Sequence, residues 1–158
     1  MKIISGGQSG ADRAALDAAI DLKFEYGGSI PQGRLTEAGA LDPKYDRMTE
    51  LSTSSYPVRT EKNVIDADAT LVFNMGTLEG GTTLTVDFAK KCNTPYLIID
   101  LKATTEPEAI RLIKEWLDVI QPQILNVAGP RESKARGIYN KVYGILMRVF
   151  GHTSLEMT

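Results

Sequence analysis

Glycine marks three junctions at which an apolar, strand-like segment meets a helix-like segment. The junctions are Gly6-Gly7-Gln8-Ser9-Gly10-Ala11-Asp12, Glu79-Gly80-Gly81-Thr82-Thr83 and Ala128-Gly129-Pro130-Arg131-Glu132-Ser133. Glycine lets the backbone approach a ligand closely, and the first turn of a helix offers unpaired N–H groups at the positive end of the helix dipole. Three such turns in one small chain predict a pocket for a phosphorylated ligand.

Strand-like and helix-like patterns alternate along the whole chain. Short apolar runs predict strands at 2–5, 24–28, 69–73, 95–99 and 124–128, and the 3.6-residue period predicts helices at 11–22, 58–67, 80–91, 105–120 and 133–150. This alternation predicts a Rossmann-like three-layer α/β sandwich, with a mostly parallel sheet of about five strands and helices on both faces. The three glycine turns are expected to meet at the carboxyl ends of the strands.

The length of 158 residues fits one domain, which we expect to span 1–158. Apolar periodicity fails from about residue 29 to residue 55, where Pro, Gly, Asp, Thr and Ser dominate. We therefore expect a long irregular segment there, and long connections of this kind are commonly functional. Its first residues, which are rich in Gly and Pro and include Arg34, form either a wall over the pocket or a surface turn.

Composition argues against several classes of function. A formal net charge of −2 gives no overall attraction for nucleic acid, and no apolar run approaches the length of a membrane span, so neither partner is expected. A single cysteine, Cys92, allows no internal disulfide, and no export signal is visible, which favours the cytoplasm. With one histidine, His152, a Cys/His zinc site is excluded, and we expect no metal site.

The first turn matches neither of the best-known phosphate-binding motifs. It lacks the G-x-G-x-x-G spacing of dinucleotide sites and the Lys-Ser/Thr pair of the P-loop. We still expect Gly6, Gly7 and Gly10 to hold a phosphate, with further hydrogen bonds from Gln8 and Ser9. The alternative is that these residues only shape a tight turn between a strand and a helix.

The second and third turns and one short helix supply the other binding candidates. N–H groups and hydroxyls at a helix start bind an anion or merely cap the helix, and an arginine there grips phosphate or stays solvated. The polar face of helix 58–67 either points into the site or lies in solvent. The candidates are Gly80, Gly81, Thr82, Thr83, Gly129, Arg131 and Ser133 in the turns, Arg59 and Asn63 on the helix, and Arg34 in the irregular segment.

Catalytic machinery is not evident in the sequence. Asp12 and Asp66 are the carboxylates nearest the candidate elements, and they show no acid–base spacing that compels hydrolysis. Cys92 stands at a helix end, where it is expected to pack as a small apolar residue. We therefore assign no catalytic residue and favour a binding protein over an enzyme.

Taken together, these segments resemble a known family. They are 5–12, Gly27-Gly28 through Pro31, Gly33-Arg34, Tyr56 with Arg59-Thr60 and Asn63-Val64, 80–82 and 126–133. In this order they are similar to the putative molybdenum carrier proteins, part of the SLOG group of Rossmann-like nucleotide-ligand proteins. The resemblance implies a carrier or binding protein for molybdenum cofactor (molybdopterin) or a nucleotide-type ligand. Together with the aromatic residues of the last helix, it also implies a homodimer or homotetramer, with a place in the internal core as the alternative for this aromatic stripe.

This sequence departs in two places from motifs of related proteins whose residues have a chemical role. Ser29 and Ile30 stand where an aromatic residue and a cysteine often precede the proline in the family, which argues against a thiol-dependent role. The related LOG-type phosphoribohydrolases carry P-G-G-x-G-T-x-x-E with a catalytic glutamate, and here that acid is missing. Cleavage of nucleoside monophosphates is therefore the alternative function, with Asp12 or Asp87 in place of the glutamate. DNA binding, known in other SLOG relatives, is disfavoured by the acidic balance.

Overall fold

A five-stranded parallel sheet forms the centre of the molecule, which is a computed structural model that describes residues 1–151. His152 lies outside the described residues. The sheet order is β2-β1-β9-β7-β8, with β9 between β1 and β7. The strands are β1 (Lys2–Ile4), β2 (Glu25–Gly27), β7 (Ala69–Asn74), β8 (Tyr96–Asp100) and β9 (Ile124–Ala128). The predicted parallel sheet of about five strands is confirmed.

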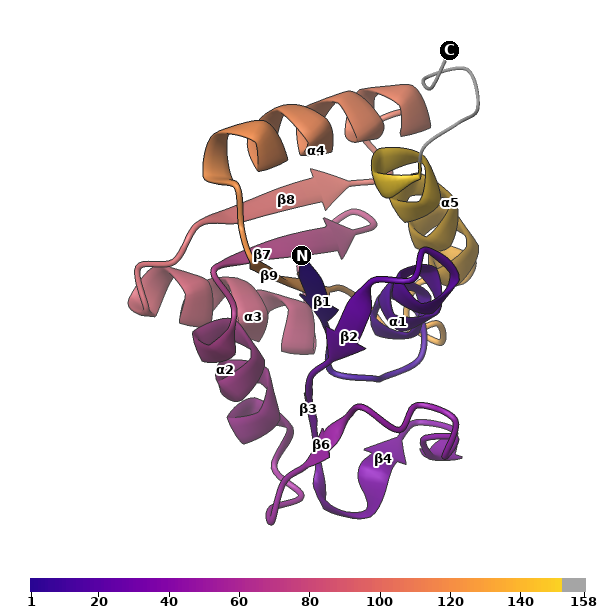
Figure 1. The fold of residues 1–158 in the computed structure, drawn as a ribbon, viewed down its shortest axis with the longest axis vertical. Helices are drawn as coiled ribbons and strands as arrows, with labels where there is room; N and C mark the ends of the chain where they lie inside the picture. The colour runs from indigo at the N-terminus through magenta and orange to yellow at the C-terminus, as the bar shows by residue number, and fades with distance from the viewer. Residues whose placement is uncertain (152–158) are drawn as a thin grey trace.

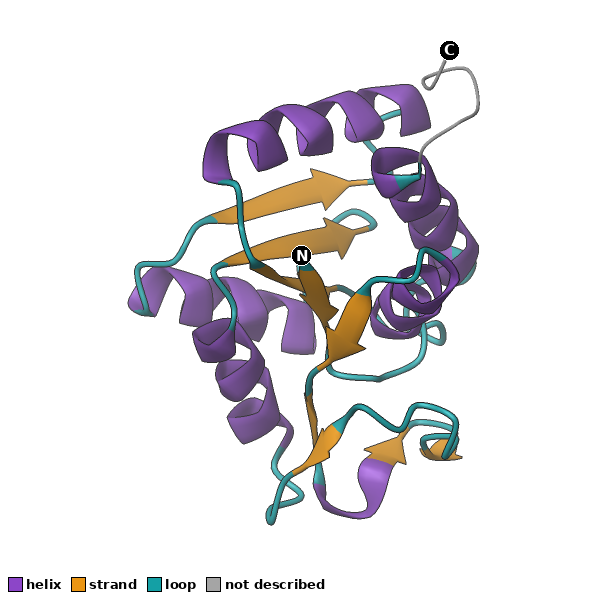
Figure 2. Ribbon diagram, viewed as in Figure 1, coloured by secondary structure: helices purple, strands orange, loops and turns teal. Residues whose placement is uncertain are grey.

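Helices cover both faces of this sheet, as Figures 1 and 2 show. On one face, the fifth helix contacts both the first and the fourth, and on the other face the second and third pack together. They are α1 (Ala11–Asp21), α2 (Tyr56–Asp66), α3 (Gly80–Lys91), α4 (Glu106–Ile120) and α5 (Ile138–Phe150). The predicted three-layer α/β sandwich is therefore confirmed. Within residues 1–151, no helix combines the length and the apolar character needed to cross a bilayer.

The core explains why these segments form these elements. All six residues of β7 are buried, as expected for a central strand with helices on both faces. The small residues of α1, including Ala11, Ala15 and Ala18, are fully buried and let this helix lie close to the sheet. Phe73 on β7 is the largest fully buried side chain. The core thus fixes the carboxyl ends of the strands, where the site lies.

The strand order locates a reversal of winding between β9 and β7. If β9 and α5 preceded β1 in the chain, the strands would read 3-2-1-4-5 across the sheet, which is the order of the first five strands in Rossmann sheets. From β9 the chain passes to α5 on one face, and from β7 it passes to α3 on the other. Open α/β sheets bind ligands at such a switch point, outside the carboxyl ends of the strands.

The segment 29–55 contains very short elements and packs against α1 beside the sheet, at the bottom of Figure 1. Ile30, Leu41 and Tyr45 form a small buried cluster with Leu16 of α1, so this segment is held by its own apolar contacts. Two-residue strands are too short to show a period in the sequence, which explains the irregular pattern. The elements are β3 (Ser29–Ile30), the 3₁₀ turn η1 (Gln32–Arg34), β4 (Leu35–Thr36), β5 (Gly39–Ala40) and β6 (Thr49–Glu50).

The predicted start of the last helix near Ser133 is wrong, because α5 begins at Ile138. Glu132 is the physical reason. Its carboxylate accepts hydrogen bonds from the N–H groups of Gly137, at 2.6 Å, and Tyr139, at 3.0 Å, and so caps the helix from a preceding turn. Gly137 has φ 88°, a left-handed conformation that no regular helix continues through.

The aromatic residues on α5 make their contacts within the same chain. The hydroxyl of Tyr139 donates to Asp17, and that of Tyr143 donates to Asp21, both on α1. The rings of Tyr139 and Tyr143 also stack, with centroids 6.1 Å apart. The aromatic stripe therefore packs α5 against α1, and it gives no argument for association between chains.

Gly144, inside α5, is a position where alanine is expected to stabilise the protein. A Cβ built there would have only Glu106 Oε1 within 4 Å, at 3.8 Å. Glycine in a helix is less favourable than alanine by about 0.5–1 kcal/mol, because it loses more backbone freedom on folding. Gly144→Ala is expected to raise the free energy of unfolding by that amount in urea denaturation. A loss of stability would mean that α5 packs more tightly at this position than the structure shows.

Candidate functional site

A cleft of about 780 Å³ opens at the carboxyl edge of the sheet. Its floor includes Asn74 and Met75, at the end of β7, and Ala128 and Gly129, at the end of β9. These are the two strands between which the winding reverses. The cleft therefore lies at the switch point of the fold, and its volume falls within the usual range for small-molecule sites.

Basic side chains dominate the charge of this cleft. Arg59, Lys102, Arg131 and Lys134 line it, against the two acidic residues Asp12 and Glu79. These cations come from α2, from the turn after β8 and from the turns between β9 and α5. The cleft thus carries local positive charge, although the whole chain has a net charge of −2. This arrangement favours an anionic ligand.

Arg59 and Asp12 form a buried ion pair in the cleft wall. Arg59 Nη1 lies 3.6 Å from Asp12 Oδ2, and both side chains are largely shielded from solvent. The guanidinium lies against Gly6, where an added Cβ would stand only 1.8 Å from Nη1. Arg59 Nε is buried without a hydrogen-bond partner. The glycine at position 6 is therefore required to admit the arginine, and the arginine retains an unused donor.

The Asp12 carboxyl has an unusual proton affinity. Burial raises its pKa to about 6, although the charge of Arg59 and a hydrogen bond from the backbone N–H of Gln8 act in the opposite direction. The N–H···Oδ2 distance from Gln8 is 3.2 Å, and the Arg59 contact is also long, so neither replaces full hydration. Desolvation therefore outweighs the attraction, and Asp12 changes its charge near neutral pH.

The ring of Tyr56 makes cation–π contacts with two of the arginines. The guanidinium carbons of Arg59 and Arg131 lie 5.7 Å and 5.6 Å from the centroid of the Tyr56 ring. These distances are within the range of cation–π attraction. One tyrosine, at the start of α2, thus positions cations from two distant parts of the chain on the same cleft.

The start of α3 opens onto the cleft. Glu79 is its N-cap residue and makes no side-chain capping bond, so the alternative in which threonine caps this helix is wrong. Gly80, Gly81 and Thr82 line the cleft, and the positions of a Cβ on either glycine face open space. The positive end of the α3 dipole is therefore accessible from the cleft.

The first glycine turn packs against the third rather than standing open. An added Cβ at Gly10 would lie 2.4 Å from the carbonyl oxygen of Pro130, and the N–H of Ala11 donates to that oxygen at 3.2 Å. The N–H groups of Gly7, Gln8 and Ser9 also have acceptors within the protein. These amides stabilise the turn itself, and of its residues Gln8 and Asp12 reach the cleft lining.

Several sequence candidates have other contacts. Arg34 donates to the carbonyl oxygens of Leu41, Asp42 and Tyr45, and so holds the segment 29–55 together. Asn63 is buried and bonds both the N–H and the carbonyl of Ser29. Ser9 and Ser133 donate to Glu37 beside the cleft. The candidates that line the cleft are Gln8, Arg59, Gly80, Gly81, Thr82, Gly129 and Arg131, and those outside its lining are Gly6, Gly7, Ser9, Gly10, Arg34, Asn63, Thr83 and Ser133.

The cleft lining also includes residues that the sequence patterns did not single out as binding groups, among them Tyr56, Asn74, Lys102 and Lys134. Lys102 follows β8 and lies over Gly76, where an added Cβ would be 3.4 Å from its Cδ. The signal that identifies Asn74 and Lys102 is their place at or just after the ends of predicted strands 69–73 and 95–99. Tyr56 belongs to the segments that carry the family resemblance, and Lys134 directly follows the third glycine turn, but no local pattern marks either as a binding group.

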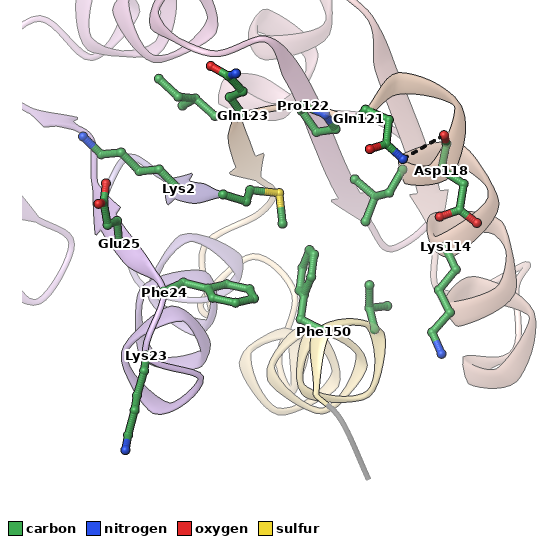
Figure 3. A pocket seen from close by; sticks show the side chains of 14 residues that line it. Lys2, Lys23, Phe24, Glu25, Lys114, Asp118, Gln121, Pro122, Gln123 and Phe150 are labelled. Carbon is green, nitrogen blue, oxygen red and sulfur yellow. Dashed lines mark hydrogen bonds between the residues drawn. The ribbon is translucent and has the colours of Figure 1, made fainter. Parts of the chain in front are cut away.

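A larger hollow, of about 1220 Å³, lies at the opposite edge of the sheet. Figure 3 shows its lining, in which Lys2 and Glu25 come from the first residues of β1 and β2, and Phe150 comes from the end of α5. The rings of Phe24 and Phe150 meet edge to face there, with centroids 5.5 Å apart. This hollow lies at the amino ends of the strands, away from the switch point.

Comparison with known proteins places these features in context. The sequence model of the circularly permutated YpsA SLOG family (cpYpsA) matches residues 3–150. A crystal structure at 1.45 Å of a putative molybdenum carrier protein from Syntrophus aciditrophicus SB is 47% identical, with a TM-score of 0.91, and the match covers 96% of this chain and 94% of that chain. Among curated proteins, none matched. A permuted order agrees with the position of β9 in the middle of the sheet.

Proposed function

The chain belongs to the circularly permutated YpsA SLOG family, and from this membership and the cleft we propose that it binds a phosphorylated small molecule at the switch point. The observation that carries the proposal is the gathering of Arg59, Lys102, Arg131 and Lys134 around one cleft that the start of α3 also faces. Arginine binds phosphate with paired, charge-assisted hydrogen bonds, and lysine adds a mobile positive charge.

Molybdenum cofactor is the first ligand that we propose, with the protein acting as its carrier. The related structure from Syntrophus aciditrophicus SB is described as a putative molybdenum carrier protein. The residues of the cleft fit a molecule of this kind, because Arg59 Nε is a buried donor without a partner and the cations suit its phosphate. Cys92 is outside the cleft lining, so the cleft offers the molybdenum no thiolate. A nucleotide satisfies the same phosphate contacts.

Anaerobic calorimetric titration with molybdenum cofactor and with a panel of nucleoside phosphates tests the proposal. We expect saturable binding of at least one ligand, and we expect Arg131→Gln to weaken it about tenfold or more, because a charge-assisted pair is worth about 1.5–3 kcal/mol. The mass of any molecule that co-purifies with the protein is an independent measurement of ligand identity.

Arg111→Gln is the matched control for Arg131→Gln. It makes the same change of net charge on the exposed face of α4, where Arg111 bonds Glu108 and Glu115. Affinity in this variant is expected to equal that of the unmodified protein. Equal weakening in both variants would show that overall charge, and not the cleft, attracts the ligand. Absence of saturable binding by every ligand would refute the proposal.

A second candidate function is hydrolysis of nucleoside monophosphates, and one observation favours it. Asp12 lines the cleft with a pKa raised to about 6 by burial, which suits a group that donates or accepts a proton near neutral pH. Asp87, the other aspartate considered, is exposed on α3 and outside the cleft lining. In this case water would bond to the ribose carbon as the bond from that carbon to the base breaks. Asp12 would give its proton to the leaving base and regain one from the attacking water.

Chromatography of the reaction mixture separates this function from simple binding. The protein is incubated with nucleoside monophosphates between pH 5 and pH 8, and free base is measured against the Asp12→Asn variant. Release of base by the unmodified protein alone would support hydrolysis. Equal background from both proteins would leave the binding function as the better explanation.

A further inference from the structure

Glu37 lies at the tip of the β4–β5 hairpin. Its carboxylate accepts hydrogen bonds from two loops that are distant from each other in the sequence. The hydroxyl of Ser9 donates to Oε1, and the hydroxyl of Ser133 donates to Oε2 at 2.5 Å. The N–H of Ser133 adds a third bond, to Oε1 at 3.3 Å. The exposed side chain of Glu37 is therefore held by a cluster of hydrogen-bond donors from the first and third glycine turns.

The cluster has the composition of a phosphate site. Two hydroxyls and one main-chain N–H point at the same pair of oxygens, and the positive charge of Arg131 acts on them as well. Hydrogen bonds from Ser133 and Ser9 hold the pKa of the Glu37 carboxyl below its usual range, so the group is present as an anion. The N–H of Glu132 donates to Ser9 Oγ at 3.1 Å and orients the hydroxyl.

The hairpin that carries Glu37 has few other attachments. β4 and β5 are joined by two residue pairs, and Gly39 next to the tip has open space around it. Most residues of 35–40 are exposed, so little apolar area holds the hairpin in place. Its other polar link is the N–H of Glu37, which donates to Gln8 Oε1 at 2.7 Å, and Gln8 lines the cleft.

We propose that Ser9, Ser133 and the Ser133 N–H form an anion subsite beside the cleft, which binds a phosphate group and which Glu37 occupies in the free protein. The subsite lies outside the cleft lining and does not depend on which ligand the cleft takes. Carboxylate and phosphate oxygens accept the same charge-assisted bonds, so they compete for one set of donors. Binding of phosphate displaces the carboxylate and frees the hairpin tip.

Calorimetric titration with inorganic phosphate tests the subsite. Glu37→Ala removes the carboxylate that competes with phosphate for the subsite. We expect this variant to bind phosphate about tenfold more tightly, because the apparent affinity rises with the fraction of molecules whose subsite is free. Glu37→Gln, which keeps a neutral acceptor, is expected to give a smaller gain in the same direction. Ser133→Ala in the Glu37→Ala background is expected to abolish the gain.

Two further variants separate the subsite from the cleft and from overall charge. Glu115→Ala makes the same change of net charge on the exposed face of α4 and is expected to leave phosphate affinity unchanged. Lys102→Ala removes a cleft cation that lies over Gly76 and is not part of the subsite, and the gain from Glu37→Ala is expected to persist in that background. Folded Glu37→Ala protein that binds phosphate no better than the unmodified chain would overturn the proposal, even if ligands bind in the cleft.

Discussion

Replacement of Gly10 by alanine is expected to lower the free energy of unfolding by about 4 kcal/mol. Gly10 precedes α1 with φ 79° and ψ −128°, a conformation that residues with a Cβ strongly disfavour. The added carbon would also lie 2.4 Å from the carbonyl oxygen of Pro130 and 2.7 Å from the N–H nitrogen of Glu132. Both obstacles are backbone atoms, so a change of side-chain rotamer does not relieve the contact.

The same substitution is expected to weaken ligand binding, because the displaced segment 130–132 carries Arg131. Urea denaturation measures the stability, and titration with the ligand identified for the cleft measures the affinity. Gly81→Ala is the matched control for the stability measurement alone, since a Cβ there meets no atom within 4 Å and the residue lies in α3, where alanine is favourable. A loss below about 1 kcal/mol in Gly10→Ala would show that the two turns separate easily and do not define a rigid rim.

The pH dependence of stability is expected to contain a contribution from Asp12 of about 3 kcal/mol. Burial raises the pKa of Asp12 from 3.8 in the unfolded chain to about 6 in the folded one, so the folded protein holds the proton more tightly. The stabilisation is therefore fully present below pH 3.8 and is lost as the pH rises through about 6.

Urea denaturation at a series of pH values between 4 and 8 checks this contribution. Asp12→Asn cannot titrate, so the difference in unfolding free energy between the unmodified protein and the variant is expected to fall as the pH rises across that range. Asp66→Asn is the control, because Asp66 forms an exposed ion pair with Lys62 on α2 and is expected to leave the slope intact. Parallel profiles for the unmodified protein and Asp12→Asn would mean that Asp12 is better solvated than its burial indicates.

Local patterns in the sequence were sufficient to predict the sheet and its five helices. Each strand core is a short apolar run, and the small residues of α1 have a clear helical period. Thr105, the first residue of the predicted helix 105–120, accepts a hydrogen bond from the N–H of Glu108. The start of α5 was not predictable in this way, because its cap is the carboxylate of Glu132, which acts from an irregular turn.

The candidate site could be predicted in part. Arg59, Gly81 and Arg131 were identified from glycine turns and polar helix faces, and the strand order brings them to one cleft. Glu37 was not, since its partners Ser9 and Ser133 are 28 and 96 residues away in the sequence. No short motif marks such a contact. It depends on the short β4–β5 hairpin, which has no period of its own.

The position of β9 also sets an order of events during synthesis. This strand is the last of the five to leave the ribosome, yet it pairs with both β1 and β7 and so joins the two halves of the sheet. Until residue 128 has emerged, β1–β2 and β7–β8 remain separate pairs, each with an unpaired edge that is open to association with other chains. Completion of the sheet and of the cleft therefore awaits the end of translation of β9, even though the segment from α1 to α3 already supplies most of the residues that line the cleft.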